Sequence, residues 1–131
     1  MVENKLDLIF KAYDVRGVYG ETLTKEIAYN IGVAFSQFVE SETIIVGHDG
    51  RNSNLEIFDC VAAGITSNDK KVFYIGTVPT DVVYSLSGLM DLPGLIITAS
   101  HNPKEWNGFK FCNSGASPIA VSYTHLRAHE T

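Results

Sequence analysis

Short apolar runs rich in β-branched residues alternate with helical segments along most of this chain. The runs lie at residues 43–46, 72–76 and 95–98, and the segments between them carry apolar residues at helical spacing. Strands that alternate with helices form a parallel or mostly parallel sheet with right-handed crossovers. Because the runs are apolar at successive positions, we expect helices to cover both faces of the sheet. The sequence therefore predicts an α/β domain.

Three helices are expected from their start signals. Thr24 is placed to cap the first helix, and Ser53-Asn54-Leu55-Glu56 has the S-x-x-E form of a capping box that opens the second, which presents Ile57, Val61 and Ile65 on one face. Thr80 is expected to cap the third helix, and Gly88 to end it.

Two further strands and three loops complete the expected order. Strands are predicted at residues 6–10 and 109–112, the latter as the last strand, and residues 11–17 have no helical period and are predicted as an ordered loop. Polar loops at residues 47–53 and 98–102 follow predicted strands. Ligands of such folds bind outside the carboxyl ends of the strands, so these loops are candidates for the site.

Composition narrows the possible functions. A length of 131 residues fits one domain with its own core, and a net charge of −5 argues against a nucleic-acid partner or an anionic membrane surface. No apolar run approaches the length of a membrane span. Cys60 and Cys112 lack metal-ligand spacing, so we expect buried free thiols, consistent with a cytoplasmic location.

Ser100 follows a predicted buried strand, and Pro103 stiffens the loop that contains it. A serine hydrolase is disfavoured, because no G-x-S-x-G turn surrounds Ser100 and the adjacent His101 is poorly placed as its base. A phosphate site fits better, since Arg16, His101 and Lys110 are available to supply positive charge.

Four segments together resemble a known family. They are FKAYDVRG at residues 10–17, GHDGR at 47–51, TASHNP at 98–103 and NGFK at 107–110. Their order is similar to that of the first domain of the α-D-phosphohexomutases, in the phosphoglucomutase/phosphomannomutase branch, over residues 8–119. The resemblance implies a three-layer α/β/α domain with a mixed, mostly parallel sheet.

The resemblance also implies an activity. Ser100 matches the serine that carries a phosphoryl group and gives it to a hexose monophosphate. The bound hexose 1,6-bisphosphate then turns over and returns its other phosphate, so hexose 1-phosphate and hexose 6-phosphate of glucose or mannose interconvert. Mg²⁺ is implied as the cofactor, bound through the phosphate on Ser100, and the bisphosphate as intermediate and activator.

Further roles follow from the same resemblance. His101, Lys110 and Arg16 match catalytic positions, with Lys110 assisting proton transfer, and Tyr13, Arg16, Asn102 and Lys110 match positions near the sugar phosphate. Three of these residues also have a structural explanation. Lys110 is also explained as a solvated strand lysine, Tyr13 as half-buried packing, and Arg16 as the partner of a carboxylate.

The GHDGR loop departs from the family pattern. His48 stands where the family usually has arginine, which removes a fixed positive charge. Asp49-Gly50 is also explained as a simple turn in which Asp49 only braces Arg51. Asp81 replaces a usual proline and is favourable in the first turn of a helix.

We expect residues 1–120 to form the nucleophile domain and residues 121–131 to be a non-native tail. The tail is similar to translated sequencing-adapter sequence, although His125 and His129 have the spacing of a metal pair on a helix. No D-x-D-x-D metal loop is present, and the resemblance places the metal, sugar and phosphate loops in domains II–IV. This chain alone is therefore expected to be inactive.

Two alternatives remain beside a glucose or mannose phosphomutase. One is a phosphoglucosamine mutase, ranked lower because that branch usually opens with GTDGIRG where this chain has KAYDVRG. The other is a non-catalytic module that binds a phosphorylated sugar or a partner without turnover.

Overall fold

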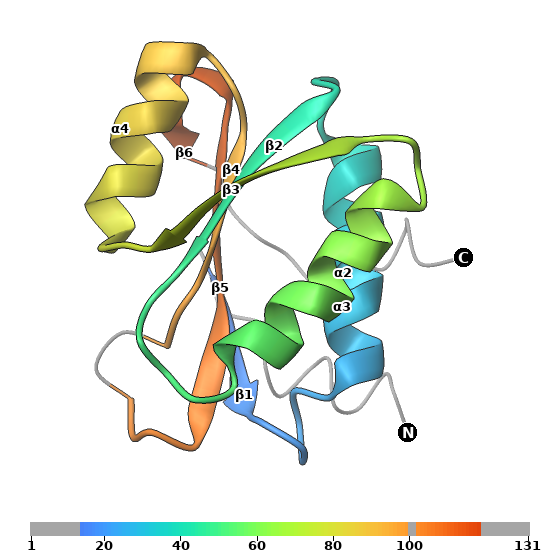
Figure 1. The fold of residues 1–131 in the computed structure, drawn as a ribbon, viewed down its shortest axis with the longest axis vertical. Coiled ribbons are helices and arrows are strands. Elements are labelled where there is room, and N and C mark those ends of the chain that lie inside the picture. Colours follow the sequence, from blue (N-terminus) through green and yellow to red (C-terminus); the bar gives the residue numbers. More distant parts are fainter. Residues whose placement is uncertain (1–13, 100–101, 119–131) are drawn as a thin grey trace.

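The structure is a computed structural model that describes residues 14–99 and 102–118 (Figure 1). The strand predicted at residues 6–10 and the tail at 121–131 lie outside the described residues. The described elements, in chain order, are β1 (Asp14–Val18), α2 (Lys25–Phe38), β2 (Thr43–His48), α3 (Asn54–Thr66), β3 (Lys71–Thr77), α4 (Thr80–Met90), β4 (Gly94–Ile97), β5 (Trp106–Asn113), the short 3-10 helix η1 (Ser114–Ala116) and β6 (Ser117–Pro118).

The strands form one mixed sheet in the order β1-β5-β4-β2-β3, with β6 pairing β5. β2 is parallel to both β3 and β4, whereas β5 is antiparallel to β4, β1 and β6. All the described strands except β5 therefore run in one direction, which confirms the predicted mixed, mostly parallel sheet.

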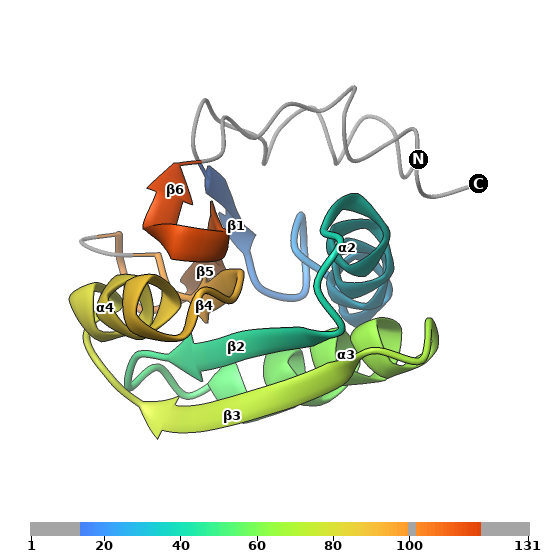
Figure 2. The ribbon, with the colours of Figure 1, turned by 90° about the horizontal axis from the view of Figure 1, so that it is seen from above.

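Helices cover both faces of the sheet (Figure 2). Ile44 and Val46 of β2 pack into a core with buried residues of α2 and α3. Ile45, between them, packs on the opposite face with Val83 of α4 and with Ile96. Successive strand residues point to opposite faces, so this division shows two separate cores and confirms the three-layer α/β/α fold.

Two helix starts differ from the predictions. The Ser53 side chain makes no cap hydrogen bond, because its hydroxyl instead accepts from Asn107 Nδ2 at 2.8 Å. Pro79 rather than Thr80 is the N-cap of α4, and α4 continues past Gly88 to Met90, where Asp91 in the left-handed conformation ends it. The predicted cap at Thr24 is confirmed, since its hydroxyl accepts from the Ile27 N–H at 3.2 Å.

The strand predictions need three corrections. Part of the loop expected at residues 11–17 is β1, an edge strand whose order comes from its pairing with β5. β5 is not the last strand, because β6 follows it. β3 is the other edge strand of the sheet, and the helices cover its faces only in part, since Phe73 and Tyr74 are 41% and 44% exposed.

Candidate active site at the carboxyl edge of the sheet

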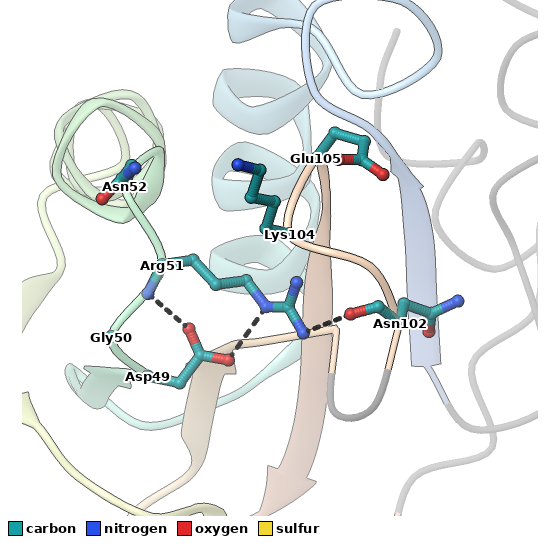
Figure 3. Close-up of a pocket in the computed structure, with 7 residues that line it drawn as sticks. All are labelled: Asp49, Gly50, Arg51, Asn52, Asn102, Lys104 and Glu105. Carbon is teal, nitrogen blue, oxygen red and sulfur yellow. Dashed lines mark hydrogen bonds and ion pairs between the residues drawn. The ribbon is translucent and has the colours of Figure 1, made fainter.

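The two polar loops meet at the carboxyl ends of the neighbouring strands β2 and β4 (Figure 3). The Asp49 N–H donates to the Ile97 carbonyl at 3.1 Å, and Thr98 Oγ1 donates to Asp49 Oδ2 at 2.7 Å. The parallel pairing of β2 with β4 places both loops at the same edge of the sheet. The described residues of the two loops therefore lie together, as expected from the sequence, and the function of this edge stays a prediction.

The carboxylate of Asp49 lies at the centre of a hydrogen-bond network. Besides the Thr98 hydroxyl, it accepts from Asn54 Nδ2 at 2.7 Å and from the Arg51 N–H at 3.1 Å. Burial raises the pKa of Asp49, but the hydrogen bonds from Asn54, Thr98 and Arg51 and the charge of Arg51 lower it below its usual value. Asp49 is therefore a structural anion in this arrangement.

The guanidinium of Arg51 joins the loop after β2 to the chain after β4. Its Nη2 donates to the Asn102 carbonyl at 2.9 Å, and its Nη1 donates to the carbonyls of Pro103 and Trp106 at 2.7 and 3.2 Å. Its Nε pairs with Asp49 Oδ2 at 3.3 Å. The Arg51 side chain is only 12% exposed, so its donors serve protein acceptors instead of solvent.

Arg16 and Lys110 lie on one face of the sheet, and Arg16 reaches the Asn102 side chain. Arg16 on β1 is opposite Gly108 of β5, and Lys110 is two residues further along β5. Residues two apart on a strand share a face, so the two cations face the same side. Arg16 Nη1 donates to Asn102 Oδ1 at 2.6 Å. The structure therefore brings Arg16 into contact with Asn102 and places Lys110 on the same face.

Asn107 is a buried amide to which the sequence assigned no role. Its Nδ2 donates to Asn54 Oδ1 at 2.6 Å, and its Oδ1 accepts from the Gly108 N–H at 2.9 Å. It therefore ties β5 to the start of α3, beside Asp49. The sequence indicates Asn107 only through its place in the NGFK motif, and nothing local to Asn54 or Thr98 indicates their contacts.

His48 is buried beneath the loop and is 5% exposed. Its Nδ1 lies 2.8 Å from the Asp49 carbonyl, which can only accept, so Nδ1 is the donor. Its Nε2 lies 2.7 Å from the hydroxyl of Tyr74 on β3. His48 therefore supports the Asp49 backbone from below and does not extend into the pocket.

An open pocket of about 640 Å³ borders these loops. Figure 3 shows its lining, with the Arg51 guanidinium between the Asp49 carboxylate and the Asn102 carbonyl. The lining residues are Asp49, Gly50, Arg51, Asn52, Asn102, Lys104 and Glu105. The predicted site residues Tyr13, Ser100 and His101 lie outside the described residues, so their roles stay predictions.

The sequence model described as "Phosphoglucomutase/phosphomannomutase, alpha/beta/alpha domain I" matches residues 7–126. The chain belongs to this family. The match confirms the resemblance found in the sequence, and it assigns the chain to domain I of the phosphohexomutases.

Curated relatives carry two different names. A phosphomannomutase of Methanocaldococcus jannaschii is 40% identical over 114 residues, which cover 86% of this chain and 25% of the relative. A phosphoglucosamine mutase of Thermotoga petrophila is 41% identical over 101 residues, covering 77% of this chain and 24% of the relative. The chain thus spans about a quarter of the length of these relatives.

A solved structure has the same fold. It is a phosphoglucomutase/phosphomannomutase family protein from Burkholderia thailandensis, with a TM-score of 0.85 and 33% identity, covering 93% of this chain and 29% of that one. The arrangement of β1, β5, β4, β2 and β3 is therefore that of a phosphohexomutase domain I.

The described residues do not fit a complete Mg²⁺ site. Within residues 14–99 and 102–118, no group of three or more His, Cys, Asp or Glu side chains is placed to hold a metal ion. The carboxylate of Asp49, in the loop after β2, is already engaged by Thr98, Asn54 and Arg51.

Cys60 and Cys112 are free thiols, and burial raises the pKa of both, although Cys60 is only half-buried. In the part of the chain that the structure describes, every helix is too short or too polar to cross a membrane.

Proposed function

We propose that this domain carries the nucleophile of a phosphohexomutase that interconverts the 1-phosphate and 6-phosphate of glucose or mannose. Phosphorylated Ser100 gives its phosphoryl group to a free sugar hydroxyl, forming hexose 1,6-bisphosphate and a free serine hydroxyl. After the intermediate turns over, the serine oxygen attacks the other phosphorus atom and the bisphosphate releases a hexose monophosphate. The phosphate has then moved between C1 and C6.

One structural observation supports this proposal more strongly than the others do. The ion pair of Asp49 and Arg51 holds Thr98 at the start and Asn102 and Pro103 at the end of the TASHNP segment. Phosphoryl transfer depends on positioning and on electrostatic stabilisation. The described residues on both sides of Ser100 in the sequence are thus anchored at the edge of the sheet where α/β folds bind ligands, which supports the proposal.

The remaining residues have complementary proposed roles. Arg16, oriented by Asn102, and His101 stabilise the transferring phosphoryl group. Lys110 moves the proton to and from the sugar hydroxyl. Tyr13 and Asn102 contact the substrate. Mg²⁺ is proposed as the cofactor with ligands beyond the described residues, and the two free thiols support a reducing, cytoplasmic location.

The proposed domain boundary and the enzyme assignment share one test. The source DNA is sequenced past the codon for Ala120, and the continued open reading frame is expressed as one protein. We expect it to convert glucose 1-phosphate or mannose 1-phosphate to the 6-phosphate, and mass spectrometry to find a phosphate on Ser100. Ser100→Ala should abolish turnover, and retained turnover would contradict the proposal.

A phosphoglucosamine mutase is the second candidate, supported by the Thermotoga relative. The same assay with glucosamine 1-phosphate distinguishes it, because the preferred sugar is the one with the highest kcat/KM. A non-catalytic binding module would bind these sugar phosphates without converting any of them.

A further inference from the structure

Arg51 makes contacts that a surface arginine of a turn does not need. Its three nitrogens reach four acceptors, which lie on two segments about 50 residues apart in sequence. With 12% of its side chain exposed, most of the guanidinium is withdrawn from water. Such a group is retained only where its donors are satisfied, and here the carbonyls of Asn102, Pro103 and Trp106 satisfy them.

The acceptor carboxylate of this pair is itself fixed. Asp49 accepts from Thr98, the residue that follows β4, and from Asn54 at the start of α3. One ion pair thus anchors the segment before Ser100 through Asp49 and the segment after His101 through Arg51. The pair also connects both anchors to the helix that starts at Asn54.

We propose that Arg51 is a positioning residue for phosphoryl transfer, which anchors Asn102 and Pro103 through its fork of donors, and Thr98 through Asp49, on either side of the proposed nucleophile in the sequence. This inference rests on the proposed function. Arg51 acts through backbone carbonyls and not on the phosphoryl group, and a lysine carries the same charge but lacks the planar fork that reaches several acceptors at once.

The test compares Arg51→Lys with the wild type in the whole protein. We expect kcat to fall about 100-fold, since a misplacement of about 1 Å at the reacting atoms has that effect. KM for the sugar phosphate should stay within about threefold, because ground-state binding is not removed. Hydrogen exchange should become faster in residues 98–106 and in the loop around Asp49, and stay unchanged around Lys70.

Lys70→Met is the matched control. The Lys70 ammonium donates to the carbonyls of Val39 and Ser41, both at 2.8 Å, and so joins two segments at the amino end of β2. Lys70 thus also anchors one segment to another, but at the amino ends of the strands, on the side of the sheet away from the candidate site. We expect this variant to lower thermal stability without changing kcat or the exchange of residues 98–106.

Thr98→Val is the second variant, for the case that Arg51→Lys does not fold. It removes the hydroxyl that donates to Asp49 and should change kcat and exchange in the same direction. A kcat within about threefold of the wild type in the folded variants would overturn the positioning role. Failure of the proposed function is distinct, because the wild type itself would then show no turnover, and the exchange measurement would still support or refute the anchoring.

Discussion

Three side chains and a backbone N–H surround the carboxylate of Asp49, which the sequence presents as one half of an Asp-Gly turn. The turn is real, since the Arg51 N–H donates to Asp49 Oδ1. However, Asn54 and Thr98 add hydrogen bonds from α3 and from the end of β4, the latter 49 positions away in sequence. The interpretation of Asp49 as a brace for Arg51 was correct but incomplete, because local sequence contains no information about partners so distant.

The lowered pKa of Asp49 predicts a dependence of stability on pH. Its carboxylate stabilises the fold fully above the unfolded pKa of about 4, and this contribution is lost as pH falls through the lower folded pKa. Thermal unfolding between pH 7 and pH 2 should therefore show a large difference in Tm between wild type and Asp49→Asn at pH 7. The difference should shrink below about pH 4, and parallel curves would contradict the assignment.

Tyr74 supports His48, and its removal should destabilise the domain. Tyr74→Phe leaves the buried Nε2 of His48 without its partner, at an expected cost of about 1–3 kcal/mol in the free energy of unfolding. Urea denaturation measures this change. Tyr29→Phe, at a position 39% exposed on α2, is the control and should be nearly neutral; equal effects of the two substitutions would refute the role of the His48 contact.

Helices α2 and α3 pack so closely that each presents a glycine to the other. A Cβ at Gly32 would overlap the Val61 carbonyl, and one at Gly64 would overlap the Tyr29 carbonyl. This contact fixes the position of α3 against α2. The first residue of α3, Asn54, in turn contacts Asp49 at the candidate site. The helical periodicity predicted both helices, and Ile57, Val61 and Ile65 are fully buried as expected, but it did not predict how closely the helices approach.

Gly64→Ala should separate the two helices and cost about 1–3 kcal/mol of unfolding free energy, the usual range for overpacking. Gly88→Ala is the control, because the nearest atom to its added Cβ is at 3.9 Å and alanine is favoured within a helix. It should stabilise the domain by about 0.5–1 kcal/mol. Chemical denaturation measures the change in the free energy of unfolding for both variants. A stabilising effect of Gly64→Ala would contradict the close contact between the helices.

The ends of elements were predicted less well than their interiors. The S-x-x-E pattern at Ser53 predicted a capping box, but tertiary contact with Asn107 takes the Ser53 hydroxyl. β1 was not predicted at all, since its residues have no strand pattern and its order comes from pairing with β5. In both cases a partner distant in sequence overrides the local preference.

The chain as a whole spans about a quarter of the length of the relatives that it matches. Its described part contains the anchoring of the proposed nucleophile segment but no cluster of metal ligands. Because the family resemblance places the metal, sugar and phosphate loops in other domains, we predict that the 131-residue chain alone shows no measurable conversion of glucose 1-phosphate to glucose 6-phosphate in a coupled assay. Activity comparable to that of the longer protein would refute this expectation, and the longer protein is its positive control.

The sequence by itself determined the α/β class, the main helices, the inner strands and the edge of the sheet that holds the candidate site. These follow from local periodicity and from the rule that polar loops after parallel strands share one edge. Only the tertiary structure decided strand β1, the contact of Ser53 with Asn107 in place of a helix cap, and the contacts that join Asp49, Arg51 and Asn54 to the chain after β4. Those features depend on hydrogen bonds between side chains and strands about 50 or more residues apart, and no local pattern encodes such partners.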